Sequence, residues 1–239
     1  MFPSCSLRDL HSAVADLTRP FRNQITFRGK PPQVGELLMI PRREIELRAS
    51  PFVPRRHCVG KIMPRGWQPN IGPIEHSTKI SRCLQHWRDG VTWEETGIYD
   101  HMMHRINESR SRQFDGCRTI EDVRARYLRL DRIYRKVAAE RALDPNPEGT
   151  PDFHMQWGII VHLGPGGVPL FGNGGCHRMA MAIALDLDHV PALLGYTHRS
   201  AAPALARYRK LTDSVFARRQ LQTGRRQQAD KDTDGPLRA

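Results

Sequence analysis

The sequence feature that most constrains the fold is a glycine pair placed directly before an apolar helix candidate. Residues 174–178 read Gly-Gly-Cys-His-Arg, and residues 179–187 are apolar on every side and contain no helix breaker. Residues 158–171, just upstream, read as two short strands interrupted by the Pro-Gly-Gly of residues 165–167. A strand, a glycine turn and a buried helix in this order predict an α/β unit with the helix N-terminus at the turn.

The expected helix start predicts an anion-binding site. The backbone N–H groups of a first helical turn have no partner within the helix, and the helix dipole favours negative charge there. His177 and Arg178 fall in this turn, where a cation is electrostatically unfavourable, and a bound phosphate would remove the conflict. The spacing fits neither a Walker A loop, whose lysine is missing, nor the G-x-G-x-x-G dinucleotide motif. The candidate phosphate-binding residues of the turn are Asn173, Gly174, Gly175, Cys176, His177 and Arg178.

Each side chain of the turn has a functional and a structural interpretation. Both glycines suit a turn with positive φ, which is compatible with the close approach of a phosphate. Arg178 is expected to pair with that phosphate, and the alternative partner is a carboxylate of the sheet. His177 either binds phosphate or fixes the turn through a hydrogen bond to the backbone. Cys176, at a helix N-terminus beside cations, is expected to have a lowered pKa that suits a nucleophile, with an unreactive thiol as the alternative.

Three further basic residues are candidates for the same pocket. His198 and Arg199 end the last expected strand, and Lys61 lies in an early one. A surface position is the alternative for each of them. His101 and His104 lie one helical turn apart, but no nearby cysteine or carboxylate completes a set of metal ligands. We therefore expect a structural or surface role for this histidine pair and no protein metal site.

The charge balance makes polyanions plausible partners. The formal net charge is +12, from 37 Lys and Arg against 25 Asp and Glu. Residues 205–239 contribute nine basic and four acidic side chains, or +5, which leaves +7 for the rest of the chain. Such a tail is typical either of non-specific nucleic-acid binding or of a solvated chain end.

The composition predicts no membrane partner and a cytoplasmic location. No window approaches the roughly 18 apolar residues of a membrane span, and residues 1–8 have no apolar run long enough for a secretory signal. The five cysteines are scattered and include no C-x-x-C pair. This pattern favours reduced thiols over a disulfide framework or a zinc ribbon.

Three segments are expected along the chain. Residues 1–32 form an N-terminal extension, residues 33–200 an α/β domain with a helical insertion at about 77–143, and residues 201–239 a basic helix followed by a tail that is disordered from residue 222. Within the domain we expect strands at 36–47 in two pieces, at 59–62 and at 190–196, and helices at 77–87, from 92 and from 119.

Two of these helix starts carry capping signals. Thr92 with Glu95 matches the capping box, and Thr119 is followed three residues later by Asp122. Apolar residues of the second helix recur three or four positions apart, namely Ile120, Val123, Tyr127, Leu130, Tyr134 and Val137. Its other face carries Arg124, Arg126, Arg129, Arg132 and Arg135. This basic face can follow a phosphate backbone, although a solvated surface is the more common role.

These motifs together resemble the ParB/sulfiredoxin-like superfamily. In that superfamily a G-x-H-R or G-x-R-R turn opens a helix, holds nucleotide phosphates and is followed by a short V-P or I-P strand. Residues 175–178 and Val190-Pro191 match this pattern. Residues 174–178 are also identical to the sulfiredoxin active-site stretch, whose cysteine attacks a phosphorylated sulfinic acid.

Most of the chain, residues 36–200, is similar to a group of uncharacterised ParB-like proteins. The matching motifs are Gly60-Lys61-Ile62 with Trp67, Trp93-Glu94-Glu95-Thr96 with Tyr99, residues 116–122, and His198-Arg199. This group usually carries arginine at the position of Cys176. Two departures weaken the inference to a catalytic metal: an acidic residue commonly stands where this chain has Gly174, and residues 65–68 lack both carboxylates of the related G-D-W-D ending.

The resemblance implies a nucleotide-dependent activity. It implies binding of ATP or CTP with Mg²⁺, and phosphoryl transfer or nucleoside-triphosphate hydrolysis at residues 174–178, where the helix terminus and Arg178 stabilise the transferred group. One alternative is a ParB-type DNA-binding protein switched by nucleotide, which grips DNA with the basic tail and helix face, although no helix-turn-helix follows the domain. A second alternative is a sulfiredoxin-like ATP-dependent reductase that uses Cys176.

Overall fold

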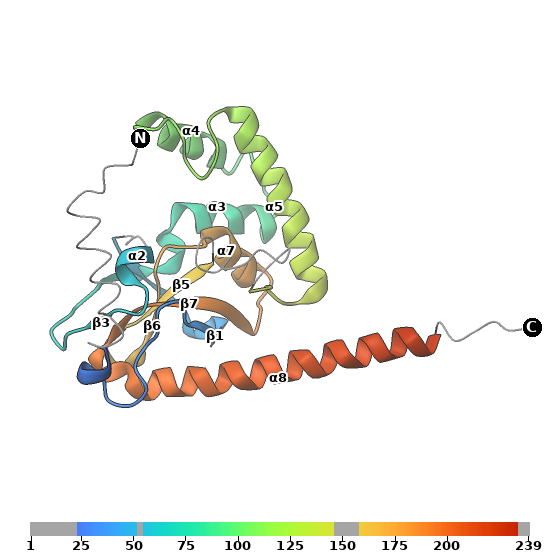
Figure 1. Ribbon diagram of the computed structural model, residues 1–239. Coiled ribbons are helices and arrows are strands. Elements are labelled where there is room, and N and C mark those ends of the chain that lie inside the picture. Colours follow the sequence, from blue (N-terminus) through green and yellow to red (C-terminus); the bar gives the residue numbers. More distant parts are fainter. Residues whose placement is uncertain (1–22, 52–54, 146–157, 234–239) are drawn as a thin grey trace, which may run out of the picture.

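The computed structural model describes residues 23–51, 55–145 and 158–233, which form a mixed seven-stranded sheet packed against helices (Figure 1). This confirms the expected α/β class. The strands are β1 (Leu37–Pro41), β2 (Leu47–Ser50), β3 (Ile62–Met63), β4 (Asn70–Pro73), β5 (Ile159–Leu163), β6 (Pro169–Phe171) and β7 (His189–His198). The helices are α2 (Arg55–Cys58), α3 (Thr78–Trp87), α4 (Ile98–Glu108), α5 (Ile120–Glu140), α7 (Cys176–Ala184) and α8 (Ala202–Thr233). Short 3-10 turns include η4 (Pro165–Gly167) and η5 (Arg199–Ala201).

β7 is the longest strand of the sheet and pairs with three others. The strand order is β1-β7-β5-β6-β2-β4, and the short β3 also pairs with β7. β1 runs antiparallel to β7 with Leu37 opposite Leu193, and β5 runs parallel to β7 with Ile160 opposite the same residue. β5 is buried along its whole length, as a continuous apolar run predicts for a strand with both faces covered. The two strands expected on either side of η4, and the last strand, are therefore confirmed.

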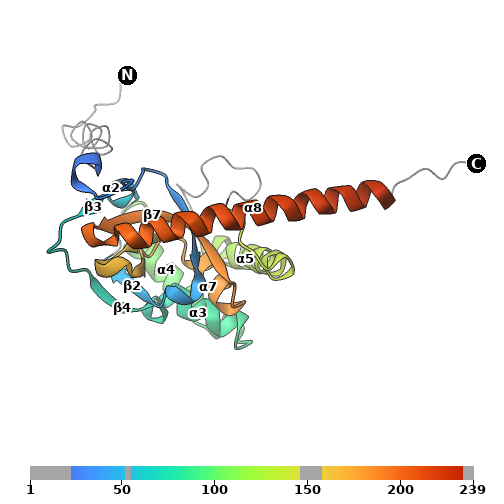
Figure 2. The same ribbon diagram turned by 90° about the horizontal axis from the view of Figure 1, so that it is seen from below.

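Helices cover both faces of the sheet. α3, α5 and α7 lie on one side and α8 lies on the other (Figure 1), and the perpendicular view shows α8 crossing the strands (Figure 2). α8 is fixed to the domain through its first three turns. Leu205 and Tyr208 are buried, and the Thr212 hydroxyl accepts a hydrogen bond from the Met39 N–H at 2.8 Å. The sheet is consequently the middle layer of a three-layer domain.

α5 forms as its sequence pattern predicts. The Thr119 hydroxyl accepts from the Asp122 N–H, and the Asp122 carboxylate accepts from the Thr119 N–H, so the capping box is complete. The apolar face packs inward, with Val123, Tyr127, Leu130 and Val137 buried. Of the arginines expected on the opposite face, Arg126 differs from the others because its side chain is only 19% exposed.

Four expectations about element boundaries are wrong. The strand expected at 59–62 begins only at Ile62, because residues 55–58 form α2 and a turn follows. The Thr92–Glu95 hydrogen bonds form, but residues 92–97 make turns and α4 begins only at Ile98, because Gly97 (φ 69°) interrupts the chain there. The second early strand lies at Leu47–Ser50, after a 3-10 turn at Arg42–Glu44. α8 continues to Thr233 through a segment expected to be disordered, where alanine, glutamine and arginine favour helix despite the scarcity of apolar residues.

The boundary of the N-terminal extension also moves. Residues 1–22 lie outside the described part, whereas the buried Asn23 side chain donates to the carbonyl oxygens of Pro32 and Gly60. Residues 23–32 thus belong to the domain. Within the described ranges, no helix combines the length and the apolar character needed to cross a membrane.

Candidate functional site

The glycine turn is shaped by close contact with β5. Gly175 is the N-cap of α7 with φ 75°, and a Cβ atom there would lie 2.8 Å from the Gly158 carbonyl oxygen. The carbonyl of Gly174, which is buried, accepts a hydrogen bond from the Ile160 N–H at 3.2 Å. No side chain caps the N-terminus of α7, so its first-turn N–H groups are left to other acceptors. The turn therefore requires glycine at position 175, as predicted.

Cys176 does not have the lowered pKa that was expected. Its Sγ lies 3.5 Å from the Asn173 carbonyl oxygen, and burial raises the pKa of the thiol. The positive charge of Lys79 opposes this effect but does not outweigh it. The thiol is consequently protonated at neutral pH, because desolvation penalises the charged form more than the nearby cation favours it. This weighs against Cys176 as a nucleophile.

His177 and Arg178 both have partners within the protein. His177 is buried with its Nε2 atom 3.3 Å from the Tyr127 hydroxyl, and burial, together with Arg126 and Lys79, lowers its pKa to about 3. Arg178 donates to the carbonyl oxygen of Asp144, and burial lowers its pKa to about 10, so it stays charged at neutral pH. His177 is thus a neutral residue that joins α7 to α5, and Arg178 is held by Asp144, whose carbonyl accepts its hydrogen bond and whose charge also acts on it.

Lys61, His198 and Arg199 do not reach the glycine turn. The turn lies beside Ile160, which is opposite Leu193, and His198 follows Leu193 by five residues along β7. At about 3.3 Å per residue, this separation is about 16 Å. Lys61 precedes β3, whose Ile62 pairs with Thr197, so it lies at the same distant end. The expectation that these three residues share the pocket of the turn is wrong, because β5 and β7 are parallel and the turn lies at the start of β5.

Three charged residues that sequence reasoning did not select lie beside the start of α7. Lys79 of α3 forms an ion pair with Asp115, from the loop before α5, and an Arg126 guanidinium nitrogen lies 3.9 Å from the same carboxylate oxygen. All three act electrostatically on His177, and Lys79 and Asp115 also act on Cys176. We call Lys79, Asp115 and Arg126 the charged triad. Arg126 was expected only as part of the basic face of α5, Asp115 directly precedes the motif at residues 116–122, and Lys79 had no sequence signal.

The charged triad leaves positive charge in excess at the helix start. Its side chains are 15%, 27% and 19% exposed for Lys79, Asp115 and Arg126 respectively. Burial opposes the ionisation of Asp115, but Lys79 with the other nearby cations holds its pKa below the ordinary value. With His177 and Cys176 neutral, two cations face one carboxylate at the positive end of the α7 dipole. Such an arrangement stabilises a bound anion.

The Nε atom of Arg126 strengthens this conclusion. It is buried and has no hydrogen-bond partner among the described residues. A buried guanidinium donor without an acceptor is unfavourable by about 1–3 kcal/mol. A phosphate oxygen in front of α7 would supply the missing acceptor.

The histidine pair at positions 101 and 104 gives no metal site. His104 lies 3.3 Å from the Glu108 carboxylate on the same helix, and burial lowers the pKa of His101. In the described ranges, no group of three or more His, Cys, Asp or Glu side chains is placed to hold a metal ion. Comparisons of the chain with family models, with curated proteins and with solved structures gave no match.

Proposed function

We propose that the protein binds the phosphates of a nucleoside triphosphate, ATP or CTP, at the N-terminus of α7 and transfers or hydrolyses the terminal phosphoryl group there. The observation that carries this proposal is that Lys79 and Arg126 meet at one carboxylate, Asp115, and that all three act electrostatically on His177 in the first turn of α7, which has no side-chain cap. Phosphoryl transfer depends mainly on positioning and on charge stabilisation, and this arrangement supplies both.

Each residue of the site has a role in this proposal. The first-turn N–H groups of α7 and the side chains of Lys79 and Arg126 bind phosphate oxygens and stabilise charge on the transferred group. Asp115, which is ionised, is the residue to accept the proton of the attacking hydroxyl or water. Gly175 lets the backbone approach closely, and Arg178 holds the segment after α5 through the Asp144 carbonyl.

The site offers few protein ligands for Mg²⁺. Mg²⁺ is commonly bound by one or two carboxylates together with the phosphates of the nucleotide, and because Asp115 is paired with Lys79 and serves as the base, the ion would be held mainly by the phosphates. The ion would neutralise charge on the phosphates. No carboxylate stands next to Gly174 in the sequence, so the residues adjoining it add no acidic ligand.

A thermal-shift panel tests the proposal. ATP, CTP, GTP and ADP with Mg²⁺ are added to the wild-type protein, to Arg126→Gln and to Arg129→Gln, a matched control on the exposed face of α5. A ligand at 100 times its Kd stabilises by about 2.7 kcal/mol, which raises Tm by several degrees at this size. We expect the shift in wild type and in the control and its loss in Arg126→Gln. A flat panel for the wild type, or equal shifts in all three proteins, would contradict the proposal.

The second candidate function is nucleotide-switched DNA binding. The observation in its favour is the exposed arginine face of α5, formed by Arg124, Arg129, Arg132 and Arg135. It predicts DNA binding that weakens steeply with salt and is lost when these arginines are replaced by glutamine. A truncation that tests the tail has to begin after residue 221, because Tyr208 and Thr212 are buried in the domain.

A further inference from the structure

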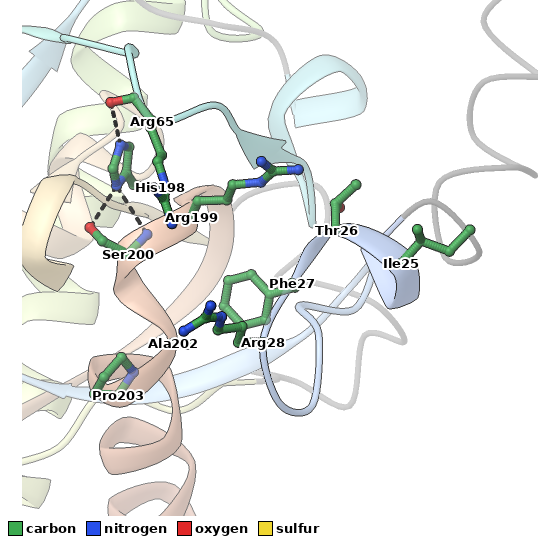
Figure 3. A pocket seen from close by; sticks show the side chains of 10 residues that line it. All are labelled: Ile25, Thr26, Phe27, Arg28, Arg65, His198, Arg199, Ser200, Ala202 and Pro203. Carbon is green, nitrogen blue, oxygen red and sulfur yellow. Dashed lines mark hydrogen bonds between the residues drawn. The ribbon is translucent and has the colours of Figure 1, made fainter.

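A second concave site lies at the opposite end of β7 from the glycine turn. Its volume is about 750 Å³, and it lies between residues 25–28, Arg65, the end of β7, and the start of α8 (Figure 3). Three arginines from three separate segments, Arg28, Arg65 and Arg199, border the hollow, and all three are exposed. Phe27, Ala202 and Pro203 add an apolar surface. We call this site the arginine pocket.

No described residue balances the charge of the arginine pocket. Among its ten lining residues there is no Asp or Glu, and the three guanidinium groups make no hydrogen bond or ion pair to any described residue. Arginines nearby on α8 differ, because Arg207 pairs with Glu44 and Arg209 with Glu36. Three like charges that share one hollow repel one another, and an anion relieves that repulsion.

His198 organises the pocket wall. Its Nε2 atom lies 3.1 Å from the Arg65 carbonyl oxygen, and its Nδ1 atom lies 2.7 Å from the Ser200 hydroxyl and accepts the Ser200 N–H at 3.1 Å (Figure 3). Trp67 stacks on the other side with ring centroids 6.4 Å apart. The buried imidazole thereby fixes the backbone that carries Arg65 next to the turn that carries Arg199. The pocket is thus held by the fold and does not depend on flexible side chains alone.

From these observations we infer that the arginine pocket binds a small phosphorylated molecule with two or more negative charges, separately from the site at α7. Its volume lies in the range of small-molecule sites, about 300–1,000 Å³. Planar guanidinium groups match phosphate oxygens in pairs, and the apolar surface around Phe27 accommodates an organic group. Recognition is directed to the phosphates, because no acidic lining residue is present to select a cation.

A small ligand fits better than a nucleic-acid strand. A strand needs cationic groups that continue along its backbone, but the next arginines on α8 are neutralised by Glu36 and Glu44. These two arginines of α8 therefore add no net charge beside the pocket. Nucleic-acid binding is therefore treated as the competing outcome of the test.

Calorimetric titration with inorganic pyrophosphate tests the inference on the full chain. The background variant is Lys79→Met/Arg126→Gln, which removes the cations beside α7. Pyrophosphate binding that remains in this variant is assigned to the arginine pocket. Adding Arg65→Gln/Arg199→Gln is expected to weaken it by about 100-fold, roughly tenfold for each guanidinium. Adding Arg110→Gln instead, an exposed arginine after α4, is the matched control and is expected to change nothing.

The outcomes separate the two sites. If the background variant binds pyrophosphate as wild type does, the α7 proposal fails. The effect of Arg65→Gln/Arg199→Gln on the affinity still tests the arginine pocket. If Arg65→Gln/Arg199→Gln leaves the affinity unchanged, the inference is overturned. It is also overturned if pyrophosphate does not bind and single-stranded DNA does so in a manner that requires Arg199. Equal urea midpoints of all variants exclude unfolding as the cause.

Discussion

Lys79 and Asp115 form an ion pair that joins α3 to the loop before α5, directly beside the first turn of α7. The pair is partly buried, so water screens it less than an ion pair on the surface. Besides joining the two segments, the ion pair keeps one carboxylate and one ammonium group at the proposed phosphate site. Replacing Asp115 is therefore expected to change stability and ligand affinity in different directions.

Asp115→Asn is expected to lower stability and raise phosphate affinity. Without the carboxylate, Lys79 and Arg126 repel each other at the helix start, which costs about 1–3 kcal/mol of unfolding free energy, less than the about 3–5 kcal/mol for breaking a fully buried pair. The same change removes a competitor for both cations, so pyrophosphate binds more tightly although phosphoryl turnover is lost. Urea unfolding, calorimetry and phosphate release measure the three effects. Asp89→Asn, at an exposed pair with Arg88, is the control and should leave affinity unchanged.

Cys176→Ser is expected to retain nucleotide binding and phosphate release. The thiol is half-buried and this burial raises its pKa, so little thiolate exists at neutral pH. Alkylation of Cys176 by iodoacetamide, followed by peptide mass spectrometry, should accordingly be slower than alkylation of glutathione. Rapid labelling of this residue together with an inactive serine variant would instead support the sulfiredoxin-like alternative.

Stability is expected to fall as the pH drops below about 6.5. Burial lowers the pKa of His162 to about 4 from the ordinary 6.5, so between these values the unfolded chain binds a proton that the folded chain does not. The loss reaches on the order of 3 kcal/mol below pH 4, and the buried His177 adds to it. Urea unfolding at pH 7, 5.5 and 4.5 measures the slope. In His162→Asn the amide oxygen can replace Nδ1 as acceptor of the Tyr196 N–H. The unfolding free energy of this variant should depend less steeply on pH. An unchanged slope would rule out His162 as a source of the pH dependence.

Gly195→Ala is expected to destabilise the fold by about 1–3 kcal/mol, the range for overpacking a core. A Cβ at this position would lie 2.2 Å from Nδ1 of the buried His162. Gly66→Ala is the control, because no atom lies within 4 Å of a Cβ there and no positive φ is required. Differential scanning calorimetry compares the two variants. Equal melting temperatures would show that His162 moves without cost.

Much of the fold follows from local sequence patterns, and much of the site does not. Some features depend only on residues close in the chain and can be predicted from the sequence. They are the periodicity of α5, the Thr119–Asp122 capping box and the strands around η4. The position of Gly175 can be predicted from the sequence for the same reason. Lys79, Asp115 and Arg126 come from three segments and meet only because α3 and α5 pack beside α7. Lys61 and Arg199 were misplaced because their location depends on strand direction, which single residues do not encode.

The contact of α8 with β1 has a consequence for how this protein can be shortened. β1 is an outer strand of the sheet, and the Thr212 hydroxyl occupies the outward-facing N–H of Met39. Removing the chain from residue 206 onward would uncover this strand and offer its backbone to other molecules. Such a fragment should self-associate through strand addition, whereas a chain that ends after residue 221 keeps the strand covered.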